Sequence, residues 1–141
     1  MKQMLIFWPM IAHAALVFVL YMELGRRRAI SASKKELHIS DFRVLRPESD
    51  TEYTGVAARA VINNFEMPVL FHAASLALFS VGAVSQSAII VAWVFIAGRI
   101  AQSLVHLTYN NVIHRAGGFF LSVFMTMALW GMLALHLLSV N

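Results

Sequence analysis

The chain of 141 residues is 60% hydrophobic and only 13% charged. Soluble domains carry about 25% charged residues, so this composition is typical of a membrane protein. The formal net charge is +4, and cysteine is absent, which excludes disulfides, thiolate metal sites and a cysteine nucleophile.

Four apolar runs, at about residues 4–24, 60–84, 88–108 and 117–138, are each long enough to cross a hydrocarbon core of about 30 Å. Backbone groups in lipid must be hydrogen-bonded internally, so these runs predict helices and not strands. We therefore expect one all-α domain over residues 1–141, built as a four-transmembrane-helix bundle. The segment at about 25–58 is expected to form a polar loop.

Local signals refine this outline. Too little apolar sequence precedes the triplet at 12–14 for a cleaved signal peptide, so the first helix is expected to be retained. Gly25 follows the first apolar run directly and suits a helix C-cap. Pro68 falls inside the second run and predicts a kink near Asn64, because proline disrupts a helix one turn upstream.

The basic residues are distributed unevenly along the chain. Most of them follow the first span, whereas the short connection at 84–87 carries none. This asymmetry predicts a cytoplasmic loop and cytoplasmic 114–115 turn, with both termini periplasmic. Acidic residues are interleaved with the basic ones, which argues against nucleic acid and leaves anionic lipid head groups as the natural partner.

Polar side chains form two stripes at helical spacing. Arg59, Asn63 and Glu66 follow i, i+4, i+7 on the second span. The third span carries a comparable stripe of Arg99, Gln102 or Ser103, His106, and Tyr109 or Asn110. A carboxylate inside a membrane marks a functional site by default and needs a partner. We expect a Glu66–Arg99 ion pair at the narrow end of a polar wedge open to the cytoplasm; interhelical packing is the simpler interpretation of the same residues.

The two stripes together resemble a known family. The pattern Arg59-x3-Asn63-x2-Glu66, followed by Arg99-x3-Ser103-x2-His106-x2-Tyr109-x5-Arg115, is similar to the MAPEG superfamily, the membrane proteins of eicosanoid and glutathione metabolism. The resemblance covers nearly the whole chain in span number, topology and motif order. It looks closest to a bacterial branch and is similar to the microsomal glutathione transferases.

The resemblance implies a homotrimer in a bacterial inner membrane that binds glutathione as a co-substrate between subunits. It implies a transferase or peroxidase acting on apolar electrophiles, with no metal. The residues implied for glutathione binding are Arg59, Asn63, Glu66, Arg99, His106 and, from the first helix, Arg28. Arg115 would stabilise the thiolate and Tyr109 would donate a further hydrogen bond. Gln102 stands where members often carry histidine, and the alternative is a non-catalytic membrane subunit that binds a larger complex or lipid.

Two further histidines fall at similar depth on the first and second spans. His13 and His72 have the placement that a haem ligand pair needs. Histidines at helix interfaces are commoner, and the glycine pattern of a haem cleft is missing. We therefore favour helix packing over haem for this pair.

Overall fold

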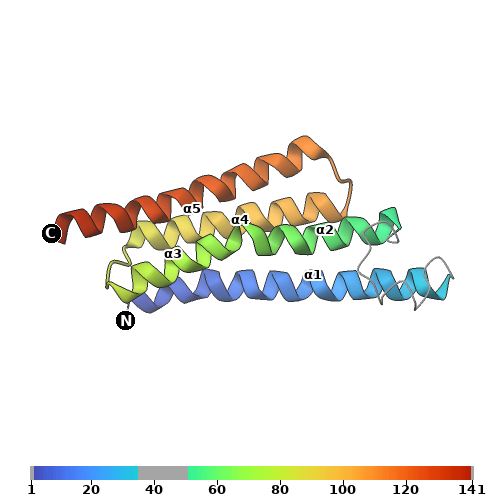
Figure 1. The fold of residues 1–141 in the computed structure, drawn as a ribbon, viewed down its shortest axis with the longest axis horizontal. Helices are drawn as coiled ribbons and strands as arrows, with labels where there is room; N and C mark the ends of the chain where they lie inside the picture. Colours follow the sequence, from blue (N-terminus) through green and yellow to red (C-terminus); the bar gives the residue numbers. More distant parts are fainter. Residues whose placement is uncertain (1, 35–50, 141) are drawn as a thin grey trace.

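The computed structural model describes residues 2–34 and 51–140. Its elements are η1 (Lys2–Ile6), α1 (Phe7–Ser33), α2 (Glu52–Glu66), α3 (Pro68–Ser80), α4 (Gln86–Leu107) and α5 (Val112–Val140). In Figure 1, α3 continues the course of α2, so the described helices form four rods, and both chain ends lie at the same end of the bundle. The expected all-α four-helix architecture is confirmed for the described residues.

The first rod is longer than its apolar run. Helix α1 passes through Gly25 without interruption, so the predicted C-cap there is wrong. The physical reason is that Glu23 pairs with Arg26 and Arg27 at i+3 and i+4, which supports the helix beyond the apolar residues. Helix α2 likewise begins at Glu52, well before residue 60. The predicted loop at 25–58 is therefore shorter, and its centre at 35–50 lies outside the described residues.

The second rod breaks at the proline, as predicted. Helix α2 ends at Glu66 and α3 begins with Pro68 as its first residue. Proline lacks a backbone N–H and its ring crowds the carbonyl four residues upstream, so one continuous helix is disfavoured here. Within the described part, three helical stretches are long and apolar enough to cross a membrane alone: Gln3–Ser33, Gln86–Leu107 and Val112–Val140. The fourth expected span is divided between α2 and α3.

Two apolar clusters hold the rods together. In the first, Phe71 of α3 stacks on Phe95 of α4, with ring centroids 4.0 Å apart and planes 6° apart. In the second, Leu20 of α1 packs against Ala57 and Ala60 of α2. Along α2 and α3 these clusters lie on either side of the helix break. The break therefore falls in the middle of the bundle, where the polar residues gather.

Helices α4 and α5 approach closely through two glycines. A Cβ atom on Gly118 would meet the Gly98 carbonyl oxygen at 2.8 Å and the Gln102 Cβ at 3.0 Å. A Cβ on Gly98 would meet the Ser122 Oγ at 2.9 Å. Small residues allow such close backbone contact between membrane helices. This glycine contact, Gly98 against Gly118, fixes the position of α4 directly beside Arg99.

Candidate functional site

A polar cluster built around Arg99 occupies the interior of the bundle. The Arg99 side chain is fully buried on α4. Its guanidinium donates to Asn64 Oδ1 at 3.3 Å, to Gln102 Oε1 at 2.7 Å and to the Asn63 carbonyl oxygen. Asn64 in turn donates to Ser103 Oγ at 3.3 Å. Neutral oxygen acceptors thus satisfy a buried cation, and the cluster joins α2 to α4.

The predicted Glu66–Arg99 ion pair is wrong. Among the described residues, the ion pairs are those of Glu23 with Arg26 and Arg27, and Glu66 is exposed. Two residues correspond to about 200° around a helix axis, so a helix that turns Asn64 toward α4 turns Glu66 away. Asn64, and not the carboxylate, is therefore the side chain of α2 that reaches Arg99.

The other predicted residues of α2 form an outer stripe of Arg59, Asn63 and Glu66. Arg59 and Glu66 are exposed and Asn63 is half-buried. Neither charged side chain has a hydrogen bond or ion pair within the described ranges 2–34 and 51–140. The structure therefore confirms that the three residues share one face. It also shows that this face points away from the chain's own interior.

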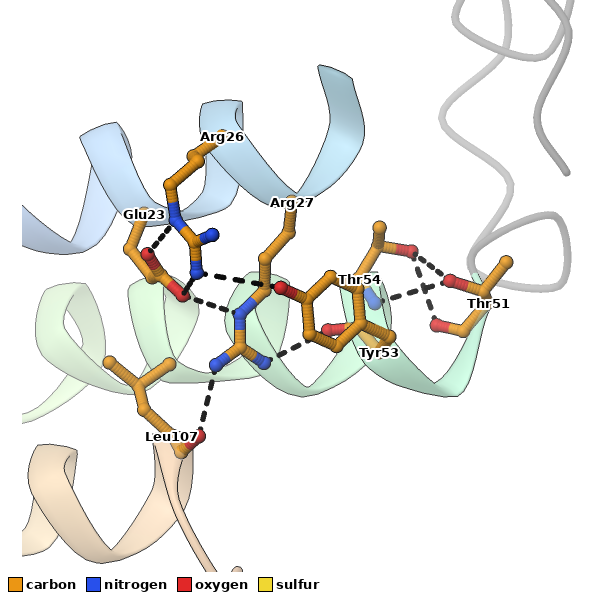
Figure 2. Close-up of polar contacts among 7 residues, drawn as sticks. All are labelled: Glu23, Arg26, Arg27, Thr51, Tyr53, Thr54 and Leu107. Carbon is orange, nitrogen blue, oxygen red and sulfur yellow. Dashed lines mark hydrogen bonds and ion pairs between the residues drawn. The ribbon is translucent and has the colours of Figure 1, made fainter. Parts of the chain in front are cut away.

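The contacts of Arg27, here called the arginine clamp, join three helices at the end of the bundle that carries the α1–α2 connection. Arg27 is buried and donates to Glu23 at 2.7 Å, to the Tyr53 carbonyl at 3.0 Å and to the Leu107 carbonyl at 2.9 Å. Its guanidinium carbon also lies 4.5 Å from the Tyr53 ring centroid. Figure 2 shows these contacts joining α1, α2 and the end of α4. The Leu107 carbonyl is one of the unpaired groups at the end of α4, which the cation satisfies.

The contacts of Arg27 were not predicted from the sequence, where Arg28 was the arginine of the first helix assigned to the site. The detectable signal was the i, i+4 spacing of Glu23 and Arg27, which favours a pair on one helical face. Arg28, the residue predicted for the site, lies half-buried at the next position of α1.

The remaining predicted residues lie at the turn between α4 and α5. The Tyr109 hydroxyl is 3.0 Å from His114 Nδ1, and Arg115 donates to Asn110 Oδ1 at 2.9 Å. Asn110 adopts a left-handed backbone conformation with φ 48°, which asparagine tolerates better than most residues. Tyr109 and Arg115 thus each contact a neighbour in the turn.

His106 is the buried residue nearest to this turn in the predicted set. Its Nε2 atom is enclosed without a hydrogen-bond partner. The positive charges of Arg27, Arg59 and Arg115 all act on its imidazole. The fold therefore brings arginines of α1, α2 and α5 around one end of α4. Arg59 and Arg115 add positive charge at this end, whereas the charge of Arg27 is paired with Glu23, so the local excess is positive and suits an anionic ligand.

His13 and His72 meet inside the bundle, with His13 Nδ1 and His72 Nε2 3.1 Å apart. A haem iron would have to lie between the two coordinating nitrogens, and here the rings hydrogen-bond each other instead. The geometry supports the packing interpretation. Among the described residues, no group of three or more His, Cys, Asp and Glu is placed to hold a metal ion.

Long apolar helices around a buried arginine cluster, with charged residues on an outward face, define an integral membrane protein of several helices. The model of the MAPEG family matches residues 6–135, so the chain belongs to the MAPEG family. No curated protein and no solved structure matches the chain.

Proposed function

We propose that the protein is a membrane-embedded glutathione-dependent transferase or peroxidase acting on apolar electrophiles. The observation that carries this proposal is the outer stripe, where Arg59 and Glu66 are exposed and make no hydrogen bond or ion pair among the described residues. An unpaired charge within a membrane helix costs several kcal/mol. A ligand or a second subunit that neutralises both charges removes this cost. Membership of the MAPEG family supports glutathione as that ligand.

The chemistry of glutathione complements the stripe. Arg59 and Glu66 are seven residues apart, which corresponds to about 10 Å along a helix. An extended tripeptide spans about 10 Å as well. Glutathione carries an ammonium group and two carboxylates, so Glu66 would pair with its ammonium and Arg59 with a carboxylate. Asn63 lies between them and would hydrogen-bond a peptide group.

Catalysis requires the thiolate form of the bound tripeptide. Arg115 would stabilise the thiolate, and Tyr109 would donate a second hydrogen bond to the sulfur. Lowering the thiol pKa by one unit requires about 1.4 kcal/mol of preference for the anion, which a guanidinium in a dry site can supply. His106, Arg99 and Arg28 would complete the electropositive surroundings. The thiol proton passes to water, and the thiolate sulfur then forms a bond to an electrophilic carbon of an apolar substrate that arrives from the lipid. The electron pair of the bond that breaks departs with the displaced group or, where the substrate is an activated double bond, takes up a proton from water.

The same proposal includes an assembly and an orientation. A homotrimer would place the outer stripe of one subunit against its neighbour, so that the site is completed between subunits. The basic residues in the last part of α1 and after it favour a cytoplasmic site in a bacterial inner membrane, with both termini periplasmic. Anionic lipid head groups would be additional partners of these residues.

A second candidate is a non-catalytic membrane subunit that binds a larger complex or lipid. The observation in its favour is that Tyr109 and Arg115 already hydrogen-bond His114 and Asn110 within the turn. For catalysis, Arg115 must exchange Asn110 for the thiolate. A purely structural role needs no such rearrangement.

Titration calorimetry of the purified protein with glutathione tests the proposal, together with ultraviolet absorbance of the thiolate near neutral pH. We expect saturable binding and a thiolate signal for the natural sequence. Glu66→Gln should weaken binding, whereas Glu52→Gln is a matched control because it lies about 20 Å away along the same helix. Arg115→Ala should abolish the thiolate signal and leave the oligomer intact. Absence of both binding and thiolate at millimolar glutathione would favour the non-catalytic subunit.

A further inference from the structure

The Asn64 carboxamide makes hydrogen bonds to three helices. Its side chain is buried, and Nδ2 donates to the Ala60 carbonyl at 2.8 Å and to Ser103 Oγ at 3.3 Å. Oδ1 accepts from Arg99 Nε at 3.3 Å, and the His13 side chain hydrogen-bonds the same carboxamide. A carboxamide has two N–H donors and one oxygen with two lone pairs, so all four hydrogen-bonding positions of Asn64 are filled. The side chain is therefore held in one orientation by α1, α2 and α4.

Arg99 holds the backbone of α2 at the same place. Its guanidinium donates to the Asn63 carbonyl as well as to the Asn64 side chain. The Asn63 carbonyl belongs to the peptide unit that joins residues 63 and 64, so one rigid, planar guanidinium holds both this peptide unit and the side chain that follows it. Arg99 is itself fully buried and does not touch a ligand bound on the outer stripe. Its effect on such a ligand is therefore indirect.

The last turn of α2 lies directly beyond these contacts. Helix α2 ends at Glu66, and Pro68 begins α3. Pro68 has no N–H to donate to the Asn64 carbonyl four residues upstream, so the regular hydrogen bonding of α2 stops here. Only Phe65 separates Asn64 from Glu66. The direction of the Glu66 side chain consequently depends on the contacts of Asn64 and Arg99, which fix this end of the helix.

Arg59, at the other end of the outer stripe, is held differently. It lies more than one turn before Asn64, in the part of α2 that packs against α1 through the second apolar cluster. That apolar packing does not depend on the polar cluster around Arg99. Loss of the Asn64 contacts should therefore displace Glu66 and leave Arg59 in place.

We propose that Asn64, held by Arg99, is a positioning residue for Glu66 and thereby determines how strongly the protein prefers a ligand with a free ammonium group. This inference rests on the proposed function, in which Glu66 pairs with the ammonium of glutathione and Arg59 with a carboxylate. Groups that bind a ligand have to be held within about 0.5 Å of the productive geometry by the residues that support them. Asn64 and Arg99 supply that support without touching the ligand.

The test compares glutathione with N-acetylglutathione, in which acetylation removes the ammonium and leaves both carboxylates. Titration calorimetry of the full chain in detergent gives both dissociation constants. We expect the natural sequence to prefer glutathione about tenfold, which one charged hydrogen bond supplies. Glu66→Gln should abolish this preference. Asn64→Leu, which keeps the size of the side chain without its hydrogen bonds, should abolish most of the preference and leave the affinity for N-acetylglutathione unchanged.

Two serine variants keep the test decisive if Asn64→Leu does not fold. Ser103→Ala removes one hydrogen bond of Asn64 and leaves the acceptors of Arg99 in place, so the protein should fold and the preference should fall by a smaller factor. Ser75→Ala is the matched control, because Ser75 is a buried serine of α3 whose hydroxyl has no hydrogen-bond partner among the described residues. This variant should leave both affinities unchanged.

The outcomes separate a positioning role from a general effect on packing. In the Glu66→Gln background, Asn64→Leu should have no further effect on glutathione affinity, because the group that it positions is already gone. An equal loss of affinity for both ligands in Asn64→Leu and Ser103→Ala would overturn the proposal, and so would an unchanged preference in both. Absence of glutathione binding by the natural sequence would overturn the proposed function together with this inference, whereas binding with an unchanged preference in the variants would overturn this inference alone.

Discussion

The glycine contact between α4 and α5 allows a sharp test of the packing. Gly118→Ala places a Cβ atom 2.8 Å from the Gly98 carbonyl oxygen and 3.1 Å from the Gln102 backbone nitrogen, and neither backbone atom can move without its helix. Overpacking of this kind costs about 1 to 3 kcal/mol. Gly117→Ala is the matched control, since a Cβ there meets nothing within 4 Å. Both changes gain the same helix propensity, up to about 1 kcal/mol, so their difference isolates the steric cost.

The assay is reversible unfolding of the two variants in detergent, followed by circular dichroism. We expect Gly118→Ala to be less stable than Gly117→Ala by about 1 to 3 kcal/mol. Because Gln102 accepts from Arg99, separation of the helices should also loosen the polar cluster. Equal stability of the two variants would refute the close approach and, with it, the derived position of α4.

Three further predictions follow from the polar contacts and the charges. Arg99→Met and Gln102→Leu should each destabilise the protein, and a double-mutant cycle should give a coupling of about 0.5 to 3 kcal/mol. Glu66→Gln should not lower the unfolding free energy, because Glu66 has no ion pair to lose among the described residues. A stability loss in Glu66→Gln as large as that in Arg99→Met would instead support an ion pair between Glu66 and Arg99. Arg27→Lys keeps the charge but loses the forked contacts to three helices, so amide hydrogen exchange should rise at the end of α4; unchanged protection would contradict the clamp. Reporters at both termini should be periplasmic and one inserted near Ser49 cytoplasmic, and a cytoplasmic C-terminus would contradict the four-span topology.

The rods themselves were largely predictable because membrane insertion depends on local hydropathy. The third span, expected at 88–108, is α4 at Gln86–Leu107. Pro68 marked the break between α2 and α3, since the lost N–H is a property of the residue alone. The helix end predicted at Gly25 was wrong, because glycine permits a helix end but does not require one. The pairing of Glu23 with the following arginines stabilises the helix beyond this position.

The candidate site was only partly predictable. Helical spacing correctly placed Arg59, Asn63 and Glu66 on one face. Spacing gives the angles between side chains on a single helix, but it does not tell which face meets the neighbouring helix. The prediction of a Glu66–Arg99 pair assumed that the stripe faced inward. The side chain of α2 that is buried against Arg99 is instead that of Asn64, the residue next to Asn63 in the sequence.

The sequence by itself determined the membrane location, the α-helical class, the helix break at Pro68 and the composition of each polar face. These properties depend on the transfer of side chains into lipid and on local backbone geometry. The tertiary structure alone decided the acceptors of Arg99 and the contact of His13 with His72. Those contacts depend on how each helix is rotated about its own axis, and close packing against the other helices sets that rotation.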